Sequence, residues 1–227
     1  MSTVVVSSSD EENASNVFET LNDRGISLST PGLLRNLILR RAATDPQREE
    51  IIEAWKTVFE IEEDVKIDDF LRHYWISRNG DIQSRKLYHE MKGVITDQEI
   101  GSLNFSLDLQ RSSALYRQIV SANEDDPEIK RLLLAIKILG AKALLPAVLS
   151  AHCVDDRKER ADFLRSLVSV YVRYAVVSGL ELSRLEDVVY ALAKNLTDTK
   201  DLRAAGKTLD TIRPQTKRSL NALLLFK

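Results

Sequence analysis

Apolar residues recur every three or four positions through most of the chain, and this repeat restricts the fold more than any other feature of the sequence. In each segment the apolar side chains fall on one side of a helix with 3.6 residues per turn. Examples are Leu33, Leu34, Leu37 and Ile38 near one end, and Leu185, Val189, Leu192 and Leu196 near the other. Only eight glycines and five prolines interrupt the 227 residues. The pattern predicts an all-α protein, a multi-helix bundle of about ten helices.

Helix start signals divide this pattern into separate elements. Asp45-Pro46 and Asp126-Pro127 each predict the start of a helix, because proline is favoured in the first helical turn. Thr96 and Glu99 have the spacing of a capping box, which predicts that a long helix begins there. The longest helix is predicted over residues 156–178.

The most apolar region, residues 132–154, is interrupted by Lys137, Lys142 and Pro146. A helix that crosses a bilayer needs about 20 consecutive apolar residues. We therefore predict a buried helical hairpin in which Gly140 ends the first helix and Pro146 lies in the first turn of the second. The expectation is a cytoplasmic protein with no membrane partner.

Charge is distributed unevenly along the chain. The 32 basic and 34 acidic residues give a net charge of −2, which argues against a generic nucleic-acid binder. Residues 24–48 hold five arginines and one aspartate, residues 60–69 hold six acids and one lysine, and residues 194–227 hold eight basic residues and three acids. Such segregation can place a basic surface next to a polyanion while the whole chain stays near neutral.

Residues suited to catalysis or metal binding are few. The single cysteine, Cys153, excludes an internal disulfide and is interpreted as a buried, inert thiol. His73 and His89 have no cysteine or carboxylate at ligand spacing, so no metal site is expected. Asp68 and Asp69 adjoin a predicted helix start, where capping explains them.

Five aromatic residues fall at helical spacing in the first third of the chain: Trp55, Phe59, Phe70, Tyr74 and Trp75. Aromatic rings can stack on nucleic-acid bases. Helical spacing is more typical of rings that pack in a core. The core is therefore the favoured interpretation of the group, and base stacking is the alternative.

A polar turn between two helical patterns is the most distinctive local motif. An amphipathic helix is predicted to end at Asn22, Asp23, Arg24 and Gly25, and a second helix follows Pro31. Arg24 and the backbone N–H groups of the turn can face the phosphates of a nucleotide. Alternatively, the four residues form a structural corner, with Asn22 capping and Arg24 in an ion pair. Both interpretations stay open.

The turn belongs to a longer motif. Residues 18–29 read Phe-Glu-Thr-Leu-Asn-Asp-Arg-Gly-Ile-Ser-Leu-Ser, and residues 33–36 read Leu-Leu-Arg-Asn. This order resembles the signature of domain-of-unknown-function family two-six-two, the GmrS-like half of GmrSD-type modification-dependent restriction nucleases. Weaker similarities follow at residues 70–75, 87–88, 116, 144–146 and 172–174.

The resemblance implies a nucleotide-dependent nuclease with parts beyond this chain. Similar proteins carry a ParB-like domain with an Asp-Gly-Gln-Gln-Arg motif and often an HNH-type nuclease domain, and this sequence contains neither motif. Residues 1–12 would be a strand remnant and linker, residues 13–211 the helical domain, and residues 212–227 a basic helix or linker. The resemblance implies a nucleotide triphosphate and a divalent metal in the complete protein, and no cofactor in this fragment.

Five basic residues are candidates for contact with the DNA backbone. Arg35, Arg40 and Arg41 belong to the predicted helix after the motif, and Lys217 and Arg218 belong to the basic C-terminal segment. Basic side chains there can neutralise phosphates. A solvated helix face and a soluble chain end are the respective alternatives.

These observations lead to one expectation about function and one alternative. The expected role is a non-catalytic helical region that couples a nucleotide site to an effector domain in a DNA restriction or modification-sensing protein. Its expected partners are an N-terminal nucleotide-binding domain, an HNH nuclease domain or subunit, DNA in the complete protein, and a second copy of the chain. The alternative is a stand-alone helical protein-interaction module without nucleotide or DNA binding.

Overall fold

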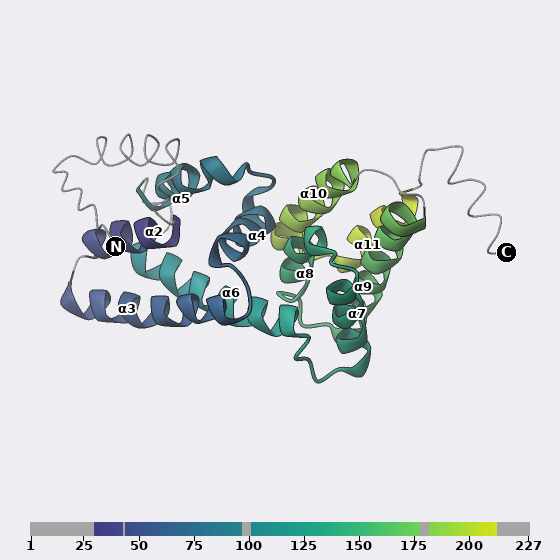
Figure 1. Cartoon of the computed structure of the whole chain (residues 1–227), viewed down its shortest axis with the longest axis horizontal. Helices are drawn as coiled ribbons and strands as arrows, with labels where there is room; N and C mark the ends of the chain where they lie inside the picture. Colours follow the sequence, from purple (N-terminus) through teal and green to yellow (C-terminus); the bar gives the residue numbers. More distant parts are fainter. Residues whose placement is uncertain (1–29, 43, 97–100, 178–181, 213–227) are drawn as a thin grey trace, which may run out of the picture.

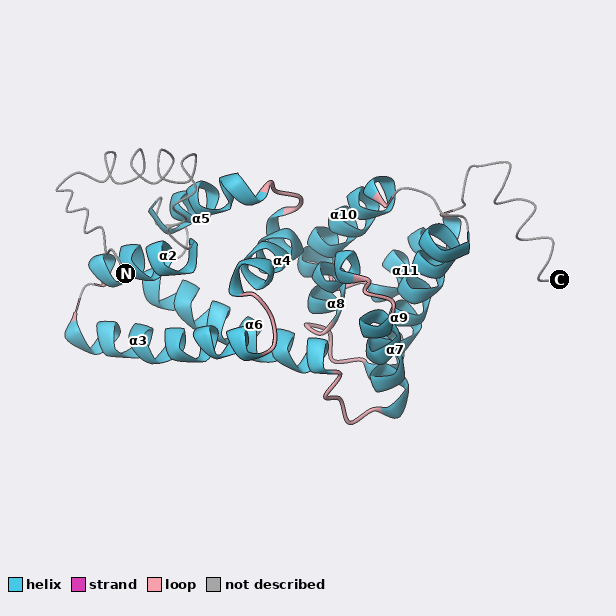
Figure 2. Ribbon diagram, viewed as in Figure 1, coloured by secondary structure: helices cyan, strands magenta, loops and turns pink. Residues whose placement is uncertain are grey.

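The computed structural model describes residues 30–42, 44–96, 101–177 and 182–212, and these residues form ten α-helices without any strand (Figures 1 and 2). The helices are α2 (Thr30–Arg41), α3 (Asp45–Phe59), α4 (Ile67–Asn79), α5 (Leu87–Thr96), α6 (Ser102–Ser121), α7 (Pro127–Ile138), α8 (Leu145–Ala151), α9 (Arg157–Tyr171), α10 (Ser183–Thr199) and α11 (Leu202–Thr211). The all-α prediction is confirmed for this part of the chain. The strand remnant predicted within residues 1–12 lies outside it.

The helices are arranged along one long axis (Figure 1). At one end α3 packs along α6, and α2 packs against α5. At the other end α9 packs between α7 and α11. Between them α4, α8 and α10 pack against one another and join the two ends. The first and last described helices therefore lie at opposite ends of the body.

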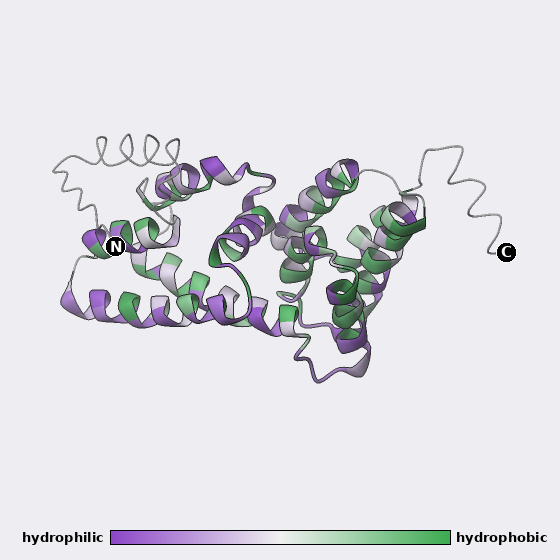
Figure 3. Ribbon diagram, in the orientation of Figure 1, coloured by the Kyte–Doolittle hydropathy of each residue, from purple (hydrophilic) through white to green (hydrophobic). Residues whose placement is uncertain are grey.

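One hydrophobic core runs through the whole described body. Figure 3 shows helices such as α3 with a hydrophilic and a hydrophobic side. The buried apolar residues form a single cluster that includes Leu34 of α2, Trp55 of α3, Leu149 of α8 and Leu209 of α11. All seven residues of α8 are buried, as expected for a helix surrounded by others. Because packed interiors have low compressibility, the two ends are mechanically connected.

Several predicted helix boundaries are confirmed. The Asp126 carboxylate accepts hydrogen bonds from the backbone N–H groups of Glu128 and Ile129, at 2.9 and 3.0 Å, and begins α7. Gly140 follows the end of α7 with φ of 61°, the left-handed conformation that suits glycine. Pro146 lies in the first turn of α8, as predicted.

The capping box at Thr96 and Glu99 is a wrong prediction for its first member. Thr96 is the last residue of α5, and its hydroxyl donates to the Gly93 carbonyl at 3.1 Å. The helix α6 begins at Ser102 instead, with Gly101 as N-cap. Burial of Ile95 explains why α5 continues to Thr96, because the packing of that side chain stabilises the last helical turn. Glu99 lies outside the described residues.

Two other predictions need correction in detail. Asp68 and Asp69 lie in the first turn of α4, but the N-cap is Lys66 and no side chain caps this end. Their charge stabilises the helix end through the macrodipole instead. The helix predicted over 156–178 is α9 followed by a π-helical turn, Val172–Val177.

Three hydroxyl and carbonyl groups tie the central helices together. The Thr197 hydroxyl of α10 donates to the Ser77 carbonyl of α4 at 2.6 Å. It also lies 3.1 Å from the Ser150 hydroxyl of α8, which is 3.2 Å from the same carbonyl. Ser77 and Ser150 are buried, so these polar groups depend on one another for hydrogen bonds.

The Thr197→Val variant is expected to lower the free energy of unfolding by about 2 kcal/mol, because it removes the donor to a buried carbonyl while keeping the side-chain shape. Urea denaturation followed by circular dichroism measures the change. Thr208→Val is the matched control, since its hydroxyl bonds only within α11, to the Ala204 carbonyl at 3.1 Å. Equal effects of the two substitutions would contradict a role for Thr197 in joining the helices.

Candidate functional site

The residues that the sequence predicts to contact a nucleotide or DNA fall into two groups. Asn22, Asp23, Arg24 and Gly25, and likewise Lys217 and Arg218, lie outside the described residues. Arg35, Arg40 and Arg41 lie on α2. Only these three arginines can therefore be placed, and the proposed contacts of the other residues stay predictions.

The three arginines of α2 point in different directions. A helix turns by about 100° per residue, so positions 35, 40 and 41 are spread around its axis. Arg35 is half-buried and Arg40 is exposed. The Arg41 guanidinium donates to the Thr96 carbonyl at 3.1 Å and so satisfies an end carbonyl of α5. The three side chains therefore form no single basic patch on α2. Contact with the DNA backbone stays a prediction.

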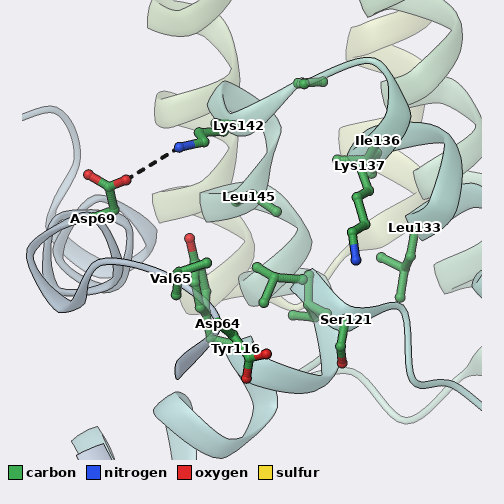
Figure 4. A pocket seen from close by; sticks show the side chains of 14 residues that line it. Asp64, Val65, Asp69, Tyr116, Ser121, Leu133, Ile136, Lys137, Lys142 and Leu145 are labelled. Carbon is green, nitrogen blue, oxygen red and sulfur yellow. Dashed lines mark hydrogen bonds and ion pairs between the residues drawn. The ribbon is translucent and has the colours of Figure 1, made fainter. Parts of the chain in front are cut away.

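The strongest candidate site among the described residues is a cavity at the junction of two halves of the body, one containing α2, α3, α5 and α6 and the other containing α7, α9 and α11. It has a volume of about 240 Å³ and lies between the start of α4, the end of α6, the end of α7 and the start of α8. Figure 4 shows side chains from these four places facing one space. Its apolar lining consists of Val65, Ile119, Val120, Leu133, Ile136, Ala141 and Leu145.

Tyr116 forms the wall of the cavity toward α4. Its ring lies 5.3 Å from the ring of Phe70, and its hydroxyl oxygen is 2.7 Å from Nδ1 of His73. Burial lowers the pKa of His73 from 6.5 to about 4 and raises the pKa of Tyr116 above its usual value. At neutral pH the pair is therefore an uncharged hydrogen bond that holds the wall in place.

Acidic side chains line one side of the cavity entrance. The Asp64 carboxylate accepts a hydrogen bond of 2.6 Å from Nε of Arg117, which also pairs with Glu63 at 2.6 Å and Glu60 at 3.7 Å. Asp68, next to Asp69 in the first turn of α4, does not line the cavity, and its pKa is raised by partial burial and by the charge of Asp69. Three acids of the run at residues 60–69, namely Glu60, Glu63 and Asp64, thus pair with Arg117.

Lysine side chains line the opposite side. Lys142 reaches Asp69 across the cavity, with 3.5 Å between Nζ and a carboxylate oxygen (Figure 4). Lys137 lines the cavity from the last turn of α7 and is exposed. Within the described ranges it forms no ion pair. The cavity therefore combines apolar walls with one uncompensated positive charge.

Sequence reasoning missed this site, although one signal for it was present. In the sequence, Lys137 and Lys142 stand out only as interruptions of the apolar stretch at residues 132–154. Both lysines are exposed, so they mark the place where this apolar stretch meets solvent. The opposing carboxylates, Asp64 and Asp69, could not be assigned to it, because they approach only when α4 packs near α8.

The aromatic group is part of the core, as favoured from the sequence. Trp55 and Phe70 are fully buried, Tyr74 and Trp75 are at most 8% exposed, and Phe59 is half-buried. Rings enclosed in this way cannot stack on bases. The core interpretation is confirmed for the four buried rings.

The prediction of a buried Cys153 is wrong. Cys153 is exposed, while its neighbour His152 has a side chain only 4% exposed. The His152 ring bonds through Nδ1 to the Val148 carbonyl at 2.8 Å, and burial is the main cause that lowers its pKa. Two residues beyond the end of α8, the chain has already turned out of the core, and the thiol turns with it.

The described ranges lack two kinds of feature. They contain no group of three or more histidine, cysteine or acidic side chains arranged to hold a metal ion. They also contain no helix with the length and apolar character required to span a bilayer.

No protein-family model matches the chain. No curated protein matches it significantly either.

Proposed function

We propose that this chain is the helical region of a GmrS-like, nucleotide-dependent DNA restriction or modification-sensing protein of the cytoplasm. In this role the helices perform no chemistry. They couple a nucleotide site, with Arg24 close to the phosphates, to an effector that acts on DNA. The motif at residues 18–29, followed by Leu-Leu-Arg-Asn at residues 33–36, is the observation that carries the proposal.

The arrangement of the helices supports a coupling role. The motif leads directly into α2, which lies at one end of the body, and α11 lies at the other (Figure 1). A continuous core and the hydrogen bonds among Ser77, Ser150 and Thr197 connect these ends. A displacement of α2 by a nucleotide-dependent partner would reach the other end through packed side chains, provided the body has two arrangements that the partner can favour differently.

The test uses the assembly that contains this chain, purified from its source organism through a tag on the chain. The assembly is expected to hydrolyse a nucleoside triphosphate at a rate that DNA changes. Arg24→Gln is expected to lower that rate at least tenfold, because a guanidinium facing phosphates stabilises their charge. Lys158→Gln, an exposed cation on α9, is the matched control and should leave the rate unchanged.

Two results would contradict the proposal. Hydrolysis by the purified chain alone would place the chemistry in these residues rather than in a partner. An assembly that hydrolyses no nucleotide and ignores DNA would favour a different role.

That different role is a stand-alone protein-interaction module, and one feature of α7 favours it. Ile138 is 83% exposed and Leu134, one turn earlier, is 40% exposed. Exposed apolar side chains one helical turn apart can contact a protein partner. The purification described above distinguishes the two roles, because an interaction module would co-purify with a protein partner and the assembly would not hydrolyse a nucleotide.

A further inference from the structure

The cavity between α4, α6, α7 and α8 has the chemistry of a small-molecule site. Its lining is mostly apolar, and its volume of about 240 Å³ exceeds the space of a single water molecule many times over. Ligand sites in proteins typically combine such walls with a few polar groups that fix orientation. The charged groups at the entrance therefore determine which ligands are suitable.

The negative charges at the entrance are already paired. The Asp64 carboxylate is held by Arg117 at 2.6 Å, and the Asp69 carboxylate is 3.5 Å from Lys142. Among the lining residues Lys137 alone carries a charge without a partner in the described ranges. An incoming cation would have to compete with Arg117 or Lys142, whereas an anion would meet a free ammonium group.

We propose that this cavity binds an organic anion with a compact apolar body, such as an aromatic carboxylate or sulfonate. The apolar body would lie against Ile119, Ile136 and Leu145, and the anionic group would face Lys137 at the entrance. Lys142 stands on the same side and can turn from Asp69 toward the anion, since its side chain is 73% exposed.

The position of the cavity gives such a ligand a structural consequence. Ile119 belongs to α6 in one half of the body, and Ile136 belongs to α7 in the other. Residues 122–126 connect the two helices without a helical turn of their own. A bound ligand would add apolar contacts across this junction and so hold the halves together. The inference rests on the cavity alone and does not depend on the proposed coupling role.

The test titrates the full chain with naphthalene-2-sulfonate and, separately, with 2-naphthylmethylammonium. The two probes have the same ring system and opposite charges. Binding is followed by the methyl NMR signals of the isoleucines. The sulfonate is expected to bind at one saturable site and to shift the signals of Ile119 and Ile136. The signal of Ile51 in α3, which does not line the cavity, should stay unchanged. The cationic probe should bind at least fivefold more weakly.

Substitution of the lysine tests the charge contribution. Lys137→Glu is expected to weaken sulfonate binding about tenfold, and Lys137→Gln about threefold, because a charge-assisted contact is lost. Lys130→Glu is the matched control, since Lys130 lies on the same helix two turns earlier, is exposed and does not line the cavity. It should change the affinity less than twofold.

Three outcomes would overturn the proposal. The first is a titration in which Ile119 and Ile136 do not respond. The second is an affinity for the ammonium probe that equals or exceeds the affinity for the sulfonate, as a purely apolar cavity or a cation site would give. The third is an equal loss of affinity in the Lys137 and Lys130 variants, which would reflect only the overall charge of the chain.

Discussion

The Trp55→Ala variant is expected to unfold with a free energy about 4 kcal/mol below that of the unaltered chain. Trp55 is fully buried in α3, at the packing surface between α3 and α6. Its indole N–H donates to the Ser106 hydroxyl of α6 at 3.3 Å. Truncation to alanine removes a large apolar surface, leaves a cavity that the neighbouring helices fill only in part, and deletes this hydrogen bond.

Circular dichroism at the helical band measures this effect during urea denaturation, because the loss of a tryptophan would disturb a fluorescence measurement. Two variants separate its causes. Trp55→Phe keeps a ring in the core and should cost less than half as much. Phe59→Ala truncates a half-buried ring one turn along the same helix, 5.7 Å from Trp55, and should also cost less.

A contradictory result is easily recognised. If Trp55→Ala unfolds at the same urea concentration as the unaltered chain, the ring does not belong to the core, and base stacking becomes the better interpretation of the aromatic group. If the Phe59 variant is the more damaged of the two, the packing of α3 against α6 is described wrongly.

Much of the fold could be predicted from the sequence because it depends on local patterns. In α7 the capping Asp126, its proline neighbour and the left-handed Gly140 are contiguous with the helix that they delimit. The apolar residues at positions 129, 132, 133 and 136 are all buried, as their spacing required. Signals of this kind act within one or two helical turns and need no knowledge of the tertiary structure.

The boundary between α5 and α6 shows where such signals fail. Thr96 and Glu99 satisfy the spacing of a capping box, yet α5 continues through Thr96 because Ile95 and Met91 are buried beneath it. Packing of the preceding helix overrides a local capping preference of about 1 kcal/mol. Cys153 illustrates the same limit, because its exposure depends on where α8 leaves the core rather than on the residues around it.

The cavity could not have been predicted because its residues meet only through tertiary packing. Lys142 and Asp69 are 73 positions apart, and Arg117 and Asp64 are 53 positions apart. The sequence displays the acidic run and the two lysines separately, and only the packing of the helices makes them opposite sides of one space. The same holds for the Ser77 carbonyl and Thr197, which are 120 positions apart.

Acid is expected to destabilise the protein between pH 6.5 and pH 4 through His73. Burial of the ring lowers its pKa in the folded state to about 4, while the unfolded chain has the ordinary value of 6.5. Between these values the unfolded state binds more protons than the folded state, so the free energy of unfolding falls as the pH falls. The stability that depends on a neutral His73 ring is fully present above pH 6.5, and about 3 kcal/mol of it is lost once the pH reaches 4.

A His73→Gln variant isolates this contribution, because glutamine does not titrate and can still form a hydrogen bond with the Tyr116 hydroxyl. The difference in unfolding free energy between the unaltered chain and the variant should be constant above pH 7. As the pH falls to 4, the unaltered chain should lose about 3 kcal/mol of unfolding free energy relative to the variant. His152, whose pKa is also lowered by burial, acts in the same direction in both proteins and cancels in the difference.

The matched control is His89→Gln, which replaces an exposed histidine of α5 and leaves the buried ring of His73 in place, so the loss of stability between pH 6.5 and pH 4 should persist. A difference between the unaltered chain and His73→Gln that stays constant from pH 8 to pH 4 would mean that the ring is already solvated in the folded state. That result would also contradict the position of Tyr116 in the cavity wall, because its phenol ring is held there by the hydrogen bond to His73. The pH profile therefore tests the stability of the core and the geometry of the candidate site together.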